Sequence, residues 1–253
     1  MDRRYTQKGV GGCQMSGVSI SDLNVAYGEE TVFKNFSADF EERKISVILG
    51  GSGVGKTTLL NAVAGLVDFG GEIEADGGGI SYIFQNDRLI PSITVYKNLD
   101  LVLRAVYKDK NERRKLIDEM LELLEISDLK NKLPTMLSGG QAQRVAMARA
   151  YLYPSDILLL DEPFKALDTA LKTRLLRHLI LLNQMQNRTV IFVTHAIDEC
   201  LLVADDYYVL AGNPVEIIHS GSIGSDKLNR RLDDVDLADI RNELLKIILD
   251  GRA

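Results

Sequence analysis

The feature that most constrains this sequence is a glycine-rich run at residues 50–57 (GGSGVGKT), which follows a short apolar segment and precedes a helical pattern. The glycines let backbone N–H groups turn inward around an anion, where side chains would obstruct its approach. The run fits G-x-x-x-x-G-K-[ST], in which Lys56 holds the β- and γ-phosphates of a nucleotide and the Thr57 hydroxyl binds Mg²⁺. A chance match is expected in about 1% of chains this size, and the flanking strand and helix lower that figure. We therefore predict a cradle for nucleotide phosphates.

β-Strand patterns occur in both halves of the chain, on either side of a long helical stretch. Alternating or continuous apolar runs predict strands at residues 18–25, 31–40, 44–49, 71–75, 80–84, 157–160, 189–193 and 207–210. The first two are expected to pair in an N-terminal antiparallel β subdomain. The later strands alternate with helical segments, which implies a parallel sheet with helices on its faces. We therefore predict an α/β fold.

The domain organisation follows from the helical stretch that interrupts the strands. We predict an α/β domain at residues 17–220 that contains an inserted α-helical subdomain at about residues 86–156. A C-terminal helical extension is expected at residues 221–253. Residues 1–16 are polar and glycine-rich, and are expected to be a disordered leader or an artefact of start-site choice, since Met15 lies just before the first strand.

Charge and cysteine content narrow the functional class. The chain has 36 Asp and Glu against 30 Lys and Arg, a formal net charge of −6, and no long basic block. Binding of nucleic acid through phosphates is therefore not expected. Two cysteines, Cys13 and Cys200, cannot form a disulfide framework and suit a reducing cytosol. No apolar stretch approaches the roughly 18 uncharged residues needed to span a bilayer, so we expect a soluble, intracellular protein.

Two adjacent acids, Asp161 and Glu162, end the apolar run at residues 157–160. Ligands of parallel α/β sheets bind at the carboxyl ends of the strands. There Asp161 can position Mg²⁺ through its water shell, and Glu162 can polarise an attacking water. Adjacent acids after an apolar strand are common alone, but a phosphate cradle in the same chain favours the functional interpretation.

Three further residues lie at predicted strand ends. His195 follows the strand at residues 189–193, where a neutral imidazole can donate to a phosphoryl oxygen, although a lone histidine is usually structural. Gln85 follows another strand and can reach Mg²⁺ and water through its amide oxygen. Tyr27 ends the first strand, where its ring can stack on adenine, although a tyrosine there more often only packs.

The run at residues 137–141 (LSGGQ) decides between classes of phosphate-binding protein. A serine-capped Gly-Gly helix start is an anion-binding feature, yet no lysine follows it, so it is not a second cradle. The run resembles the signature motif of ATP-binding cassette (ABC) ATPases, and the sequence is identified as a member of that family over about residues 17–220. Pro134 occupies the position of the proline that shortly precedes the signature in this family, and residues 166–168 (ALD) resemble its D-loop motif.

The resemblance implies a role for each landmark. The catalytic residues are Glu162, His195, Gln85 and Lys56. ATP is bound by Tyr27, Gly50, Gly51, Ser52, Gly53, Val54, Gly55, Lys56, Thr57 and Thr58, and in trans by Ser138, Gly139, Gly140 and Gln141 of a second subunit. Mg²⁺ is held by Thr57, Gln85 and, through water, Asp161.

The family also implies partners and a location. Two cassettes close head to tail over two ATP molecules, and the helical insert receives separate permease subunits. Such a chain lies on the cytoplasmic face of the membrane, resembles the ATPase subunits of bacterial importers, and works indirectly with a solute-binding protein. Within the importers, residues 84–101 and 158–169 look like the nitrate/sulfonate/taurine type. Ser92 and Lys165 depart from that pattern, where tryptophan and a small residue are usual. A large C-terminal regulatory domain is not expected.

Other functions of an ABC ATPase fit less well. Family members in DNA repair or translation generally carry long coiled-coil insertions, two cassettes or basic surfaces, which this acidic sequence lacks. An accessory ATPase of Fe–S cluster assembly is distinguished by its gene neighbourhood, since adjacent permease and solute-binding genes support transport. A regulator without turnover is disfavoured by the presence of both Glu162 and His195. We predict an ATP-hydrolysing subunit that energises solute import.

Overall fold

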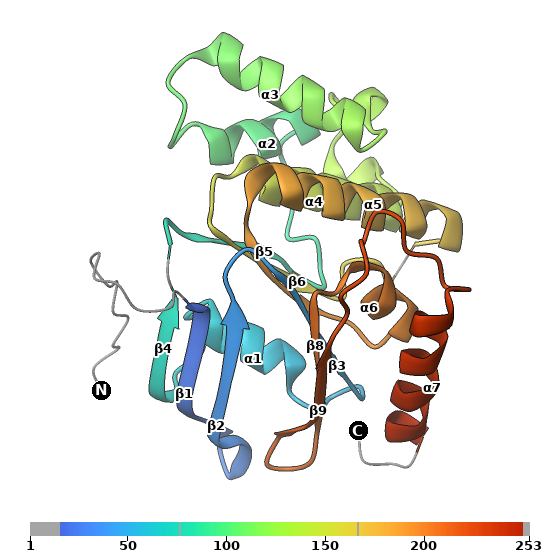
Figure 1. The fold of residues 1–253 in the computed structure, drawn as a ribbon. Coiled ribbons are helices and arrows are strands. Elements are labelled where there is room, and N and C mark those ends of the chain that lie inside the picture. The colour runs from blue at the N-terminus through green and yellow to red at the C-terminus, as the bar shows by residue number, and fades with distance from the viewer. Residues whose placement is uncertain (1–15, 76, 166, 250–253) are drawn as a thin grey trace.

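The computed structural model describes residues 16–75, 77–165 and 167–249. The predicted leader therefore lies outside the described residues except for Ser16, and so does Ala166 of the predicted D-loop. The described chain forms two β-sheets with helices packed around them (Figure 1).

The smaller sheet is antiparallel, as predicted, and has three strands. It consists of β1 (Ser16–Tyr27), β2 (Glu30–Glu41) and β4 (Gly70–Ala75), in the order β2-β1-β4. Along β2, Phe36, Ala38 and Phe40 are buried while the residues between them are exposed. This period of two is typical of a sheet that covers the core with one face only.

The larger sheet has six strands in the order β5-β6-β7-β3-β8-β9. Its strands are β3 (Ile45–Gly50), β5 (Ile80–Ile83), β6 (Ile157–Asp161), β7 (Thr189–Val193), β8 (Asp206–Ala211) and β9 (Glu216–Ser222). The first five in space are parallel, as predicted. β9 pairs antiparallel with β8 and was not predicted; it crosses residue 220, the predicted domain boundary.

Helix α1 (Lys56–Val63) lies between the two sheets, in one apolar core, and the six-stranded sheet separates this core from a second one (Figure 1). Alternate residues of the parallel strands face opposite cores: Ile48 packs with α1 and the antiparallel sheet, whereas Val47 packs with the other helices. Helices on that second face include α5 (Thr169–Gln186), α6 (Ile197–Val203) and α7 (Val235–Leu249). Both faces are covered, which explains why every residue of β6 and β7 is buried.

The predicted helical insert connects β5 to β6, which are neighbours in the sheet. It contains α2 (Val95–Leu103), α3 (Lys110–Leu123) and α4 (Gly139–Leu152), with short 3₁₀ turns at Ser127–Leu129 and Pro134–Met136. Figure 1 shows α2 and α3 farthest from the sheets, with α4 between them and the sheets.

One buried acid joins the first two helices of the insert. Asp100 of α2 is 4% exposed and accepts hydrogen bonds from Arg104 Nε and Arg113 Nε, each at 2.7 Å. Burial acts to raise the pKa of Asp100, but the two guanidinium groups outweigh it and hold the pKa below its usual value.

Candidate functional site

The predicted phosphate cradle connects the end of β3 to the start of α1. Gly53 and Gly55 have φ angles of 82° and 116°, in the left-handed region that favours glycine. A Cβ at Gly55 would lie 2.9 Å from Val32 Cγ1, and one at Gly50 would lie 2.7 Å from the Leu210 carbonyl oxygen. Glycine is therefore required at Gly53 by conformation, at Gly50 by space, and at Gly55 by both.

Lys56 lies at the first position of α1 and is only 5% exposed. Its Nζ donates to the carbonyl oxygens of Gly50 at 2.8 Å and Gly51 at 2.7 Å, so the ammonium folds back over the loop. Burial lowers the pKa of Lys56, and the nearby acids Glu162 and Asp161 only partly offset this. A buried cation paired mainly with neutral carbonyls fits an anionic ligand such as a triphosphate.

Thr57 and Asp161 meet where α1 passes the carboxyl end of β6. Thr57 Oγ1 lies 3.1 Å from Asp161 Oδ1 and 2.9 Å from Oδ2, and Asp161 is 2% exposed. Burial raises the pKa of Asp161, against the hydrogen bond from Thr57. Among the described residues no cluster of three or more His, Cys, Asp or Glu side chains is suited to a metal. One carboxylate and one hydroxyl fit Mg²⁺, which completes its shell with water and phosphate oxygens.

Glu162 lies one residue further and points to a different set of partners. Its Oε1 is 3.2 Å from His195 Nδ1, and its Oε2 is 2.8 Å from Lys165 Nζ. Burial acts to raise the pKa of Glu162, but the hydrogen bonds from Lys165 and His195 outweigh it and lower the pKa. Sequence reasoning noted Lys165 only as an unusual residue, because nothing in the pattern showed that its side chain returns to Glu162.

The buried acid Glu199 holds the segment around His195 in place. Thr194 Oγ1 donates to Glu199 Oε2 at 2.6 Å, and Lys172 Nζ lies 2.8 Å from Glu199 Oε1. Glu199 is 4% exposed. This link joins α5 to the end of β7 and the start of α6, and it was not predicted from the sequence.

Two predicted site residues lie outside this hydrogen-bonded cluster. Gln85 is exposed, two residues beyond the end of β5, and Tyr27 is 51% exposed at the end of β1. Neither bonds to Thr57, Asp161 or Glu162 in the described part of the chain. The loop after Gln85 is nevertheless held from the insert, because Arg149 of α4 donates to the carbonyl oxygens of Arg88 and Asp87 at 2.7 and 3.0 Å.

The predicted signature run forms the start of α4. Ser138 Oγ accepts a hydrogen bond from the Gln141 N–H at 3.3 Å, and Gln141 Oε1 accepts one from the Ser138 N–H at 3.0 Å. This reciprocal capping box fixes the helix start. Gly139 is exposed, and a Cβ there would meet nothing within 4 Å, whereas a Cβ at Gly140 would lie 2.9 Å from Leu167 Cδ2. Within the described chain no hydrogen bond joins this helix start to the phosphate loop.

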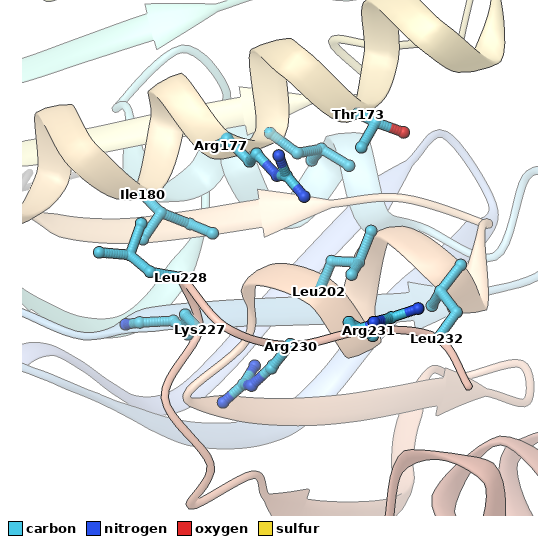
Figure 2. Close-up of a pocket in the computed structure, with 10 residues that line it drawn as sticks. Thr173, Arg177, Ile180, Leu202, Lys227, Leu228, Arg230, Arg231 and Leu232 are labelled. Atoms are coloured by element: carbon cyan, nitrogen blue, oxygen red, sulfur yellow. The ribbon is translucent and has the colours of Figure 1, made fainter. Parts of the chain in front are cut away.

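A separate cavity of about 220 Å³ lies between α5, α6 and the segment that follows β9. Figure 2 shows Arg177 reaching into it from α5, with Leu202 of α6 and Arg231 on the other side. None of its lining residues belongs to the phosphate loop, the acid pair or the start of α4, so we do not place the nucleotide there.

The fold and the clustered residues together define a class. A strand that leads through a glycine-rich loop into a helix, with acids at the end of another parallel strand of the same sheet, is the arrangement of P-loop nucleoside triphosphatases. Residues 33–165 match the family model described as ABC transporter. A maltose/maltodextrin import ATP-binding protein of Vibrio vulnificus is 32% identical over 94% of this chain and 70% of its own length. Its Vibrio cholerae counterpart is 33% identical over 85% of this chain and 64% of its own length. The chain belongs to the ABC transporter family, as an ATP-binding ATPase.

Solved structures of ABC cassettes share the fold. The dimeric bacterial ABC transporter cassette MJ0796 aligns with a TM-score of 0.75 and 29% identity over 83% of this chain and all of that one. The same cassette in a post-hydrolysis state bound to ADP and Pi gives a TM-score of 0.74. CbiO1 of Clostridium perfringens, part of the transporter complex cbiONQ, aligns with a TM-score of 0.72 and 25% identity over 91% of this chain and 99% of that one. The predicted fold class is confirmed.

Proposed function

We propose that this ABC ATPase energises the import of a solute, by hydrolysing ATP between two head-to-tail subunits. The observation that carries the proposal is the meeting of Lys56, Asp161, Glu162 and His195 at the carboxyl ends of β3, β6 and β7. These four groups supply a cation for phosphates, a ligand for Mg²⁺, a base for water and a donor for a phosphoryl oxygen. The import names of the relatives support the direction of transport.

Each residue of the site has a defined part in the proposed reaction. The backbone N–H groups of residues 51–58 surround the phosphates, and Lys56 Nζ exchanges the carbonyl oxygens of Gly50 and Gly51 for β- and γ-phosphate oxygens. Mg²⁺, when bound, neutralises charge that develops on those oxygens. Thr57, Asp161 and Gln85 are the groups that would hold it. Tyr27 stacks on the adenine.

The acid and the histidine act at the γ-phosphate. Glu162 polarises the attacking water and accepts its proton, while His195 donates to a phosphoryl oxygen. The 3.2 Å contact between Glu162 Oε1 and His195 Nδ1 keeps the two side chains next to each other before substrate arrives. Lys56 remains beside the leaving phosphates and stabilises the charge that builds up there.

The second subunit completes the site in the proposed dimer. Ser138, Gly139, Gly140 and Gln141 form a capped helix start whose first two residues are exposed. Among the described residues, no hydrogen bond joins it to the phosphate loop. Its N–H groups suit a γ-phosphate bound to another copy. The MJ0796 cassette, similar in fold, is dimeric.

The remaining parts of the assembly are also proposals. Separate permease subunits would contact the insert at α2 and α3, and a solute-binding protein would act on the outer side of the membrane. The described residues contain no helix long and apolar enough to cross a membrane, and we place the subunit on the cytoplasmic face. We retain 17–220 as the cassette domain, with 221–253 as its extension. We also retain the nitrate/sulfonate/taurine type as a hypothesis beside the maltose-type relatives.

The variant Glu162→Gln tests the proposal. It should bind Mg-ATP like the wild type but hydrolyse it at least about 10²-fold more slowly, because the water loses its base. Binding is measured with a fluorescent ATP analogue and hydrolysis by phosphate release. Turnover by Glu162→Gln at the wild-type rate would show that Glu162 does not have this role.

A further inference from the structure

Lys165 reaches back to the carboxylate that we propose as the base. Glu162 through Lys165 form a tight turn after β6, in which the Lys165 N–H donates to the Glu162 carbonyl oxygen at 3.3 Å. This turn places Lys165 Nζ 2.8 Å from Glu162 Oε2, while His195 Nδ1 lies 3.2 Å from Oε1. Both oxygens of the carboxylate therefore have a partner within the chain.

The Lys165 contact opposes the proposed task of Glu162. A base must turn one oxygen toward the attacking water and accept its proton. An ammonium 2.8 Å away favours the orientation in which Oε2 faces Lys165 over one in which it faces the attacking water.

We propose that Lys165 is a positioning residue that holds the Glu162 carboxylate in a resting orientation and so limits ATP turnover by the subunit. The proposal rests on the proposed role of Glu162 as the base. In this proposal, the Glu162–Lys165 ion pair must open, at least in part, before Glu162 accepts a proton from water.

The exposure of the two side chains makes such opening easy. The Glu162 side chain is 11% exposed, but the Lys165 side chain is 52% exposed, so water and salt reach the ammonium. The ion pair is therefore strong enough to bias an orientation and too weak to lock it.

The position of the turn connects it to the start of α4. Leu167 follows Lys165 by two residues, and its Cδ2 is the atom that a Cβ at Gly140 would meet at 2.9 Å. Asp168 then caps α5 by accepting a hydrogen bond from the Leu171 N–H at 2.9 Å. Leu167, two residues after Lys165, therefore packs against the start of α4.

Steady-state ATP hydrolysis by the full chain tests the proposal. Lys165→Met removes the charge and keeps an unbranched side chain, so kcat should rise about two- to fivefold, the effect of an exposed ion pair, with KM for ATP unchanged. Lys165→Arg keeps the charge and should keep the wild-type kcat. Lys115→Met removes a still more exposed lysine (77%) from the Lys115–Glu119 pair of α3 and should leave kcat unchanged.

Ionic strength gives a readout that a purely structural role would not move. Added salt screens the ion pair, so the ratio of the Lys165→Met rate to the wild-type rate should fall toward one. If Lys165→Met lowers the melting temperature, Lys165→Gln replaces it in the same comparison. A kcat that is unchanged or lower in the charge-free variant, or equally raised in Lys165→Arg, overturns the proposal.

Failure of this proposal is distinguishable from failure of the proposed function. Glu162→Gln is measured in the same experiment, and its loss of turnover supports the base whatever Lys165 does. If Glu162→Gln retains the wild-type rate, the role of Glu162 is wrong and the restraint by Lys165 is overturned with it.

Discussion

Replacing Lys56 with methionine removes the buried ammonium of the phosphate loop and keeps most of its apolar side chain. Lys56 is 5% exposed and donates to two neutral carbonyl oxygens at 2.8 and 2.7 Å. The cost of burying the charge, several kcal/mol, opposes the gain from these bonds. Burial also lowers the pKa of Lys56. We therefore expect the free energy of unfolding without nucleotide to change by less than about 1 kcal/mol.

The same change should strongly weaken ATP binding. Two charge-assisted hydrogen bonds to phosphates, at about 1.5 kcal/mol each, amount to about 3 kcal/mol, or roughly 10²-fold in Kd. Urea unfolding gives the stability, and titration with a fluorescent ATP analogue in the presence of Mg²⁺ gives the affinity. Binding by Lys56→Met within about threefold of wild type would refute the reasoning, as would a loss of stability large enough to explain weaker binding.

Two further predictions concern assembly and stability. In light scattering, Glu162→Gln should be monomeric alone and should double its mass when Mg-ATP is added. The double variant that also carries Ser138→Tyr should stay monomeric, because the ring blocks the start of α4. An unchanged mass in Glu162→Gln would argue against a site shared between subunits. Asp100→Asn should reduce the free energy of unfolding by about 3 kcal/mol at pH 7, since Arg113 and Arg104 lose a buried partner. The pKa of Asp100 is lower in the folded state than its usual value. The stability that its carboxylate contributes is therefore full above about pH 4 and is lost as pH falls through the folded-state pKa. In urea unfolding at a series of pH values, a stability difference between wild type and Asp100→Asn that is equal at pH 7 and pH 2.5 would contradict this.

The parallel strands and the phosphate loop were predictable because their signals are local. Buried strands such as β6 and β7 are continuous apolar runs, and the loop is a fixed spacing of glycines before Lys56. β9 (EIIHSGS) has only two adjacent apolar residues, and its side chains alternate between exposed and half-buried at the edge of the sheet. Its pairing with β8 is a tertiary contact, and no hydrophobic periodicity in the sequence predicts it.

Side-chain partners were the least predictable part of the site. The link between Thr194, Glu199 and Lys172 joins α6 and α5, and the contact between Lys165 and Glu162 depends on the shape of one turn. Charged residues at such positions usually belong to a solvated surface. Only the conformation of the backbone shows that these side chains converge on the acids.

The different orientations of the two adjacent acids follow from one backbone angle. In a regular strand, successive side chains point to opposite faces, and Asp161, the last residue of β6, turns to Thr57 at the start of α1. Glu162 has φ at 46°, in the left-handed region, which costs a residue other than glycine about 1–3 kcal/mol. Its N–H still donates to the Val193 carbonyl oxygen at 2.9 Å, so the end of β7 holds this conformation. The turn directs Glu162 toward His195 and Lys165 and away from the Thr57 side of the site, which separates the acid that we propose as a metal ligand from the acid that we propose as the base.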